Sequence, residues 1–205
     1  MIFHFIRQSL RNPNTVGAVL PSGGGLARAM ANAALPKGHT PQNVLEVGPG
    51  TGPVTQELHS RLQPGDHIEA VELNSEFCKV LRARYPELLL HEKSILDYEP
   101  PRPVDTIVSG LPLANFPAEL VEAIYKHFFQ ILRPGGHLIM FQYIGLRHAV
   151  RAMAGRESRI RMDRILKLEQ SLDPLIIQRI RVPWNVPPAM VTVRRRPDDL
   201  ALPMR

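Results

Sequence analysis

An apolar run that leads into a glycine-rich loop is the feature that most constrains the fold. Residues 44–53 read Val-Leu-Glu-Val-Gly-Pro-Gly-Thr-Gly-Pro. Pro53 suits the first turn of a helix, where the missing amide hydrogen is not needed. A second apolar run ends in Glu72, about 20 residues after the loop, where a carboxylate can bind ribose hydroxyls. The pattern predicts a βαβ unit that binds a nucleoside.

The spacing of the glycines narrows the ligand. A dinucleotide loop reads G-x-G-x-x-G, and here Gly48 and Gly50 fit but Pro53 occupies the third glycine position. Glu46 places a negative charge beside the loop, which would repel a pyrophosphate, and the lysine of a P-loop is missing. A ligand with a nucleoside, a cationic amine and a sulfonium suits this loop. We therefore expect S-adenosylmethionine (SAM); a glycine-rich turn in an ordinary α/β protein is the simpler alternative.

Strand-like and helix-like segments alternate through the rest of the chain. We predict strands at 43–47, 67–72, 88–91, 106–109 and 137–143, and helices at 23–35, 53–62, 75–85 and 118–132. Repeated β-then-α units imply a parallel sheet with helices on both faces. Further helices are expected at about 146–154 and 158–167, and antiparallel hairpin strands at 175–182 and 189–194. The fold class is α/β, Rossmann-like, with a mostly parallel seven-stranded sheet.

The N-terminal region is basic and contains no acid before Glu46. Residues 2–11 have the spacing of a short amphipathic helix, which is marginal alone in water but gains order in a bilayer interface. The residues expected to bind a membrane are Ile2, Phe3, Phe5, Ile6, Arg7, Leu10 and Arg11. A helix packed onto the domain is an equally open alternative.

Composition limits the possible disulfide, metal and membrane-spanning features, and the sequence contains a second basic cluster. The net charge is +6, and the single cysteine excludes an internal disulfide and a Cys-based metal site. No metal is expected, and no apolar run approaches the ~20 residues of a transmembrane helix. A second basic cluster comprises Arg147, Arg151, Arg156, Arg159, Arg161 and Arg164. It suggests either a polyanionic partner or a solvated basic face.

The segment after the strand at 106–109 is the candidate acceptor site, because ligands bind beyond the carboxyl ends of such strands. It reads Ser109-Gly110-Leu111-Pro112-Leu113. Methyltransferases that act on adenine carry N/D-P-P-Y/F here, with the aromatic ring stacked on the base. Leu113 supplies no such ring, which favours a non-planar amine; a plain strand-to-helix turn is the alternative.

Several sequence blocks together resemble bacterial phospholipid N-methyltransferases, which are similar in sequence to ribosomal RNA adenine dimethylases. The blocks are 11–13, 15–22, the glycine motif at 46–52, 109–113 and 185–189. The resemblance implies SAM-dependent methylation of phosphatidylethanolamine towards phosphatidylcholine, with S-adenosyl-L-homocysteine as product. It implies a cytoplasmic enzyme, peripheral to an anionic membrane, that needs no nucleic acid partner. An RNA adenine dimethylase, an enzyme acting on another lipid amine such as ornithine lipid, and a non-catalytic SAM-binding module remain alternatives.

The same resemblance assigns domains and site residues. Residues 1–35 would form a helical membrane-binding or lid segment, and 36–205 the methyltransferase domain. The cofactor would contact Thr15, Ser22, Glu46, Gly48, Gly50, Thr51, Glu72, Leu73, Ser94, Ile95 and Ser109; the acceptor would contact Ser109, Gly110, Leu111 and Pro112. Ser94 departs from the Asp that usually bonds the adenine amine. The general base stays open among His4, Glu92, Tyr143 and His148.

Overall fold

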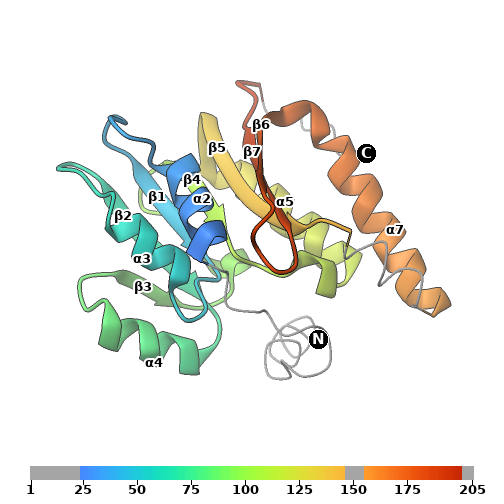
Figure 1. Ribbon diagram of the computed structural model, residues 1–205, viewed down its shortest axis with the longest axis horizontal. Helices are drawn as coiled ribbons and strands as arrows, with labels where there is room; N and C mark the ends of the chain where they lie inside the picture. The colour runs from blue at the N-terminus through green and yellow to red at the C-terminus, as the bar shows by residue number, and fades with distance from the viewer. Residues whose placement is uncertain (1–23, 146–154, 200–205) are drawn as a thin grey trace.

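The computed structural model describes residues 24–145 and 155–199, which form one seven-stranded sheet covered by helices (Figure 1). The strand order is β3-β2-β1-β4-β5-β7-β6. The strands are β1 Asn43–Val47, β2 His67–Glu72, β3 Leu89–Glu92, β4 Val104–Ser109, β5 Leu132–Tyr143, β6 Ile176–Val182 and β7 Ala189–Arg195. β1 to β5 pair in parallel, and β7 runs antiparallel to both β5 and β6. The expected α/β class, the mostly parallel sheet and the C-terminal hairpin are confirmed.

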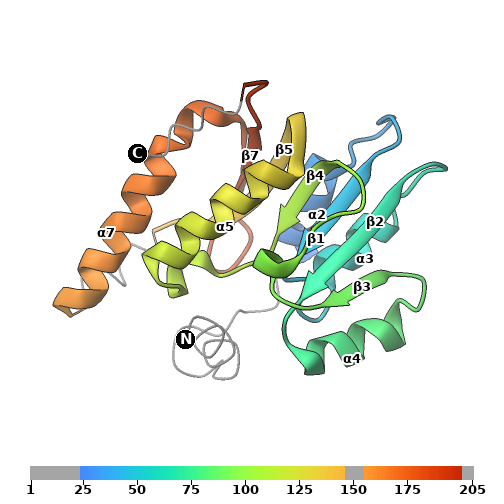
Figure 2. The ribbon, with the colours of Figure 1, turned by 180° about the vertical axis from the view of Figure 1, so that it is seen from behind.

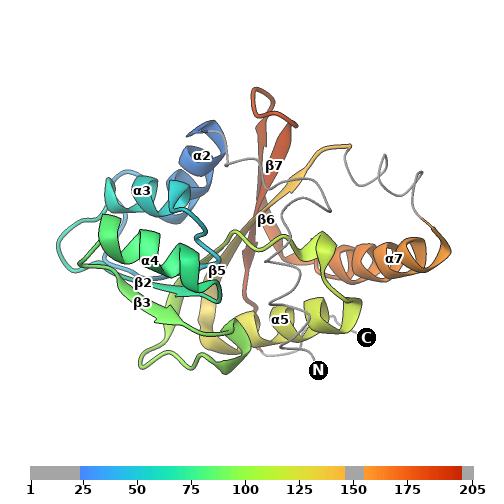
Figure 3. The ribbon, with the colours of Figure 1, turned by 90° about the horizontal axis from the view of Figure 1, so that it is seen from below.

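Helices cover both faces of the sheet, as Figures 2 and 3 show. The helices are α2 Gly24–Ala34, α3 Pro53–His59, α4 Ser75–Arg84, α5 Ala118–Ile131 and α7 Arg156–Ser171, with short 3-10 turns η1 Ile95–Asp97, η2 Leu113–Asn115 and η3 Asp173–Leu175. Helices α2, α3 and α4 lie on one side and α5 and α7 on the other. Neighbouring strand residues face opposite sides. Val44 therefore joins the core under α2 and α3, and Leu45 joins the core under α5.

Helix α2 belongs to the packed domain. Its buried residues are Leu26, Ala27, Met30, Ala31 and Ala34, which recur at helical spacing and pack with α3, β4, β5 and β7. Residues 1–23 lie outside the described residues, and so do the predicted membrane-binding residues, Thr15 and Ser22. The N-terminal division of the chain therefore stays a prediction.

Several elements differ in length from the predictions, and α3 and β5 show why. Helix α3 ends at His59, and the chain then continues with tighter i→i+3 bonds such as the one from the Arg61 amide to the Leu58 carbonyl. Strand β5 starts at Leu132, whereas the sequence predicts a strand that starts at residue 137. The Gly135 amide bonds the Arg196 carbonyl at 3.1 Å, and the Arg196 amide bonds the Gly136 carbonyl at 2.8 Å. These long-range bonds extend the strand, and local sequence does not reveal them.

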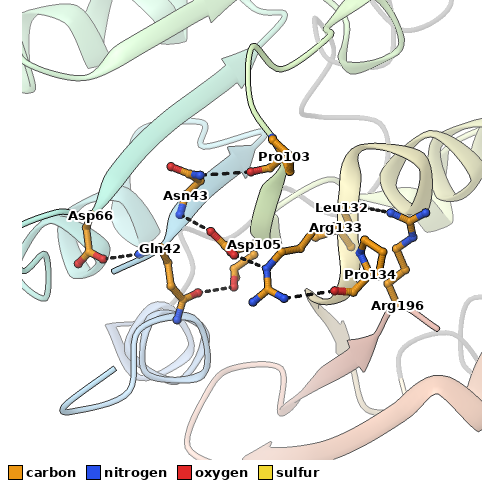
Figure 4. A network of polar contacts seen from close by, with 10 residues as sticks. Gln42, Asn43, Asp66, Pro103, Asp105, Leu132, Arg133, Pro134 and Arg196 are labelled. Atoms are coloured by element: carbon orange, nitrogen blue, oxygen red, sulfur yellow. Dashed lines mark hydrogen bonds and ion pairs between the residues drawn. The ribbon is translucent and has the colours of Figure 1, made fainter. Parts of the chain in front are cut away.

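A polar network ties the amino ends of the strands together (Figure 4). Asp105 accepts hydrogen bonds from the Asn43 amide at 2.7 Å and from the Arg133 guanidinium. The Thr106 hydroxyl donates to the Gln42 side chain at 2.8 Å, and the Arg196 guanidinium donates to the Leu132 carbonyl. The amino edge of β1, β4 and β5 is therefore held by side chains.

Helices capable of crossing a bilayer are absent from the described ranges 24–145 and 155–199, judged by length and apolar content. The same ranges hold no group of three or more His, Cys, Asp or Glu placed to bind a metal ion.

Candidate active site

The site lies at the carboxyl ends of β1 and β4, where the strand order reverses. From β1 the chain proceeds outward through β2 and β3, and then returns to place β4 on the other side of β1. Such a switch point leaves a crevice between the two loops that leave the sheet. Here these loops are the glycine loop after Val47 and the loop after Ser109, which reads Gly-Leu-Pro and is called the acceptor loop below.

The three glycines of the loop have different roles. All three adopt positive φ: 69° at Gly48, 61° at Gly50 and 88° at Gly52. A Cβ on Gly50 would meet nothing within 4 Å, so this residue borders open space suited to a ligand. A Cβ on Gly52 would lie 3.0 Å from the Tyr85 ring, so this glycine serves packing against α4 instead. Gly50 is therefore the glycine of this loop that borders open space.

Glu72, at the end of β2, is oriented by the backbone around it. Its carboxylate accepts hydrogen bonds from the Gly50 amide at 3.1 Å and from the Asn74 amide at 2.8 Å, on different oxygens. Burial raises the pKa of this carboxyl, and the Asn74, Gly50 and Leu73 amides oppose the rise. Each carboxylate oxygen can accept a second hydrogen bond. The carboxylate therefore keeps acceptor capacity that ligand hydroxyls can use.

Glu46 is a buried carboxyl inside β1, with 2% of its surface exposed. Burial raises its pKa to about 8; the Thr55 hydroxyl and amide oppose this increase and the Glu72 charge adds to it. Within the described residues, neither Glu46 Oε2 nor Thr55 Oγ1 completes a hydrogen bond of normal geometry. An unsatisfied buried carboxyl is costly. It suits a ligand that brings a cation or a donor.

The acceptor loop packs directly on the glycine loop. The Gly110 amide donates to the Val47 carbonyl at 2.8 Å, and a Cβ on Gly110 would lie 2.6 Å from the Gly48 carbonyl oxygen. Position 110 thus has no room for a side chain. Ser109 is buried, and its Oγ accepts a 3.4 Å hydrogen bond from the Leu111 amide. Leu111 and Pro112 are partly exposed beside this contact.

The position that would carry a stacking aromatic in an adenine-acting enzyme faces inward. Leu113 begins η2, is 3% exposed and belongs to the core under α5. This position therefore offers no face on which a planar base could stack.

The remaining predicted cofactor residues surround the ends of β1, β2 and β3. Thr51 is exposed on the loop and Leu73 is partly buried after β2. Ser94 is 5% exposed and caps η1, accepting a hydrogen bond from the Leu96 amide at 3.2 Å, while Ile95 is buried. The Ser94 hydroxyl keeps its proton and one lone pair for a further contact. These contacts with a cofactor stay predictions.

Two of the four candidate general bases lie in the described residues, and neither is poised to accept a proton. Hydrogen bonds from Ser75 and Arg82 lower the pKa of the exposed Glu92. Burial raises the pKa of Tyr143, which disfavours its phenolate. The Tyr143 hydroxyl is buried without a partner in the described chain, so it can offer a hydrogen bond instead. His4 and His148 lie outside the described residues.

Sequence reasoning missed three residues that shape this site. Asn74 caps α4 through its side chain, and its amide orients Glu72. Thr55 lies beside Glu46, and the Tyr85 hydroxyl donates to the Gly52 carbonyl at 3.3 Å. An Asn directly before a helical run is a capping signal that would have identified Asn74. The contacts of Thr55 and Tyr85 are tertiary and leave no local signal.

The arrangement suits group transfer by positioning. A carboxylate with spare acceptor capacity, an open glycine backbone and a buried carboxyl converge at one edge of the sheet. SAM supplies an electrophilic methyl group when bound. Holding a nucleophile in line with such a methyl accounts for much of the rate enhancement in transfer reactions of this type.

Comparison with known proteins agrees with this site. Residues 44–136, which contain the glycine loop, Glu72 and the acceptor loop, match the family model described as a methyltransferase domain. Fold, site and match together define the class of the protein: a SAM-dependent methyltransferase with the Rossmann-like methyltransferase fold.

Individual proteins with known names match this chain at low identity or over only part of its length. The chain is 27% identical to an ornithine lipid N-methyltransferase from Singulisphaera acidiphila over 143 residues, which cover 65% of this chain and 73% of that protein. It is 37% identical over 95 residues to ribosomal RNA small subunit methyltransferase A from Synechococcus sp. (strain JA-3-3Ab), covering 44% of this chain. The chain spans only 31% of the length of that second relative.

Solved structures share the fold. The N-methyltransferase NodS from Bradyrhizobium japonicum WM9, in complex with S-adenosyl-L-homocysteine, aligns with a TM-score of 0.66 at 16% identity, covering 94% of this chain and 98% of that one. Magnesium protoporphyrin IX methyltransferase (ChlM) from Synechocystis PCC 6803 aligns with a TM-score of 0.62 at 12% identity, covering 84% and 83% of the two chains.

Proposed function

We propose that the protein transfers methyl groups from SAM to the amine of a membrane lipid headgroup. The first candidate is phosphatidylethanolamine, with its mono- and dimethyl forms, on the path to phosphatidylcholine. The enzyme would work from the cytoplasm at the inner face of the membrane. Its predicted basic N-terminal segment would bind the anionic surface.

The main support for this proposal is the fraction of each relative's length that this chain matches. The match to the ornithine lipid enzyme covers 73% of that protein, whereas the ribosomal RNA enzymes match over 31% and 34% of their lengths. A short match is what a shared cofactor site alone would produce. The longer match supports a shared acceptor class, a lipid amine.

The geometry of the acceptor loop argues in the same direction. Gly110 has no room for the polar side chain with which adenine-acting enzymes hold the target amine, and Leu113 offers no ring face. A nucleobase would therefore find neither of its two usual contacts. A flexible primary amine needs only hydrogen-bond acceptors, which the loop carbonyls provide.

Ornithine lipid is the second candidate acceptor. The relative from Singulisphaera acidiphila, which matches 65% of this chain, is named as an ornithine lipid N-methyltransferase. Phosphatidylethanolamine and ornithine lipid both present a primary amine on a flexible chain beside polar headgroup atoms.

Mass spectrometry of lipids can test the proposal directly. Purified full-length protein is incubated with SAM and anionic vesicles that contain phosphatidylethanolamine, ornithine lipid or neither. We expect a mass gain of one to three methyl groups on one of the two lipid amines. Methylation of ribosomal RNA with both lipids unchanged would overturn the proposal.

A further inference from the structure

The turn between β6 and β7 exposes two large apolar side chains. We call residues 183–188 the hairpin tip. Within it Trp184 is 94% exposed and Val186 is 79% exposed. The other exposed large apolar side chains in the described chain are only 45% to 57% exposed. Large apolar side chains displayed this fully mark contact surfaces when they occur together.

The hairpin tip is held from inside. Asn185 is 7% exposed; its amide donates to the Val182 carbonyl at 3.3 Å, and its side-chain amide donates to the Pro187 carbonyl at 2.8 Å. Trp184 and Val186 flank this anchored residue. Their exposure therefore belongs to an ordered turn that presents them to the outside.

The hairpin tip lies at the same edge of the sheet as the active site. Ala189 pairs with Tyr143 at the carboxyl end of β5, and the Ile144 amide donates to the Pro188 carbonyl at 2.7 Å. β5 runs parallel to β4, which leads into the acceptor loop. Figure 1 shows the hairpin loop below the β6 and β7 labels, at the end of the sheet towards which β1 also runs. Ile144, 45% exposed, adds a third apolar side chain there.

The start of helix α2 also lies beside the hairpin. A Cβ on Gly25 would be 3.7 Å from Val182 Cγ1, at the base of the hairpin tip. Gly24 is the first described residue. The described fold therefore begins next to the base of the hairpin tip.

The charge around the hairpin tip suits an anionic surface. The chain contains no acid between Asp173 and Asp198. Arg179 and Arg181 are exposed on β6, and Arg181 forms no ion pair with any residue that the structure describes. Trp at an apolar–polar boundary flanked by arginine is typical of protein segments that lie in membrane interfaces.

We infer that the hairpin tip inserts Trp184 and Val186 into the interfacial layer of an anionic bilayer, with Arg181 at the level of the headgroups. This contact turns the carboxyl edge of the sheet, and the acceptor loop on it, towards the lipid. The inference rests on the proposed function, because this orientation brings the acceptor loop to its substrate only if the substrate is a membrane lipid.

The fluorescence of the unmodified protein tests insertion, because Trp184 is its only tryptophan. Full-length protein is titrated with vesicles of phosphatidylglycerol and phosphatidylcholine, with and without bromine atoms on the acyl chains. We expect a blue shift of the emission and quenching by the brominated lipid. Unchanged emission at lipid concentrations where the protein co-sediments with vesicles would overturn the inference. A change in Trp184 emission that occurs only on addition of another protein, and not with vesicles, would also overturn it.

A paired substitution measures the energetic contribution of the hairpin tip. Trp184→Ser combined with Val186→Ser should weaken co-sedimentation with anionic vesicles by about tenfold or more, because burial of such side chains is lost. Leu89→Ser is the matched control, since Leu89 is 52% exposed at the amino end of β3, away from the hairpin. Equal vesicle affinity of the paired variant and the wild type would contradict the inference. Melting curves establish that both variants are folded.

A short-chain acceptor separates this inference from the proposed function. With a lipid amine dispersed below its micelle concentration, the paired variant should keep the wild-type rate and lose rate only on vesicles. Equal losses on both substrates would overturn the membrane role of the hairpin tip. If the wild type methylates neither lipid, the proposed function fails, whereas the Trp184 emission still decides insertion.

Discussion

The two ends of the central strands are built on opposite plans. At the amino ends, side chains meet side chains and backbone, as when Asp105 joins the Asn43 amide to Arg133. At the carboxyl ends, the two loops meet through their backbones, and two carboxyls, Glu46 and Glu72, are buried with bonding capacity unused. The comparison indicates that the amino ends stabilise the sheet, whereas the carboxyl ends keep polar groups with unused hydrogen-bonding capacity that a ligand can bind. Substitutions at the two ends should therefore separate stability from binding.

The largest expected effect is at Glu72. Glu72→Ala removes the carboxylate assigned to the ribose and should weaken SAM binding by about 100-fold or more, since each hydrogen bond to a charged group contributes about 1.5–3 kcal/mol. Isothermal titration calorimetry measures this. Glu69→Gln is the control on the same strand: Glu69 binds the Tyr98 hydroxyl and His91, away from the site. That variant should keep its SAM affinity, and an unchanged affinity in Glu72→Ala would refute the ribose assignment.

The next effect tests the contact between the two loops. Gly110→Ala places a methyl group 2.6 Å from the Gly48 carbonyl and forces the loops apart. We expect about 1–3 kcal/mol of destabilisation and a drop of about tenfold in methyl transfer. Gly155→Ala is the control, because a Cβ there meets nothing within 4 Å. Denaturant unfolding and a radiolabelled-methyl assay measure the two effects; equal behaviour of both variants would contradict the steric account.

A substitution at the amino edge should show the opposite profile. Asp105→Ala leaves the Asn43 amide and Arg133 without their partner. The free energy of unfolding should fall by about 1–2 kcal/mol, with SAM affinity unchanged. Glu99→Ala is the control, because Glu99 is an exposed acid that lies shortly before β4 in the sequence. Chemical unfolding followed by circular dichroism separates the two variants, and a loss of SAM affinity in Asp105→Ala would break the comparison.

The last prediction is a pH dependence set by Glu46. Its pKa is raised to about 8 in the folded protein, so the folded state holds a proton that the unfolded state releases at lower pH. Stability from this group therefore declines as pH rises from about 4.5 to about 8. A cationic ligand prefers the charged carboxylate, so SAM affinity should rise by up to about tenfold per pH unit below about pH 8. Glu46→Gln should flatten both dependences, which calorimetry in buffers of different pH can measure.

Much of the fold was predictable because its signals are local. β1 and β2 begin and end where the apolar runs do, and Pro53 opens α3 as its lack of an amide hydrogen predicts. The start of β5 was not predictable, since it depends on the backbone of Arg196, far along the chain. The candidate site divides in the same way. The glycines and Glu72 follow a spacing rule, whereas the inward position of Leu113 and the orientation of Glu72 by Asn74 arise from tertiary packing.

The contact between Gly48 and Gly110 also bears on how such an enzyme changes over evolutionary time. A side chain at position 110 would force the Gly48 backbone to move, and a side chain at position 48 would have a strained positive φ and would displace the Leu111 side chain. A lineage that acquires a new acceptor therefore has little freedom at these two positions. Divergence has to come from the periphery, at partly exposed positions such as Leu111 and Pro112 or in the segments around the site. Innovation in acceptor choice then leaves the ancestral cofactor geometry intact.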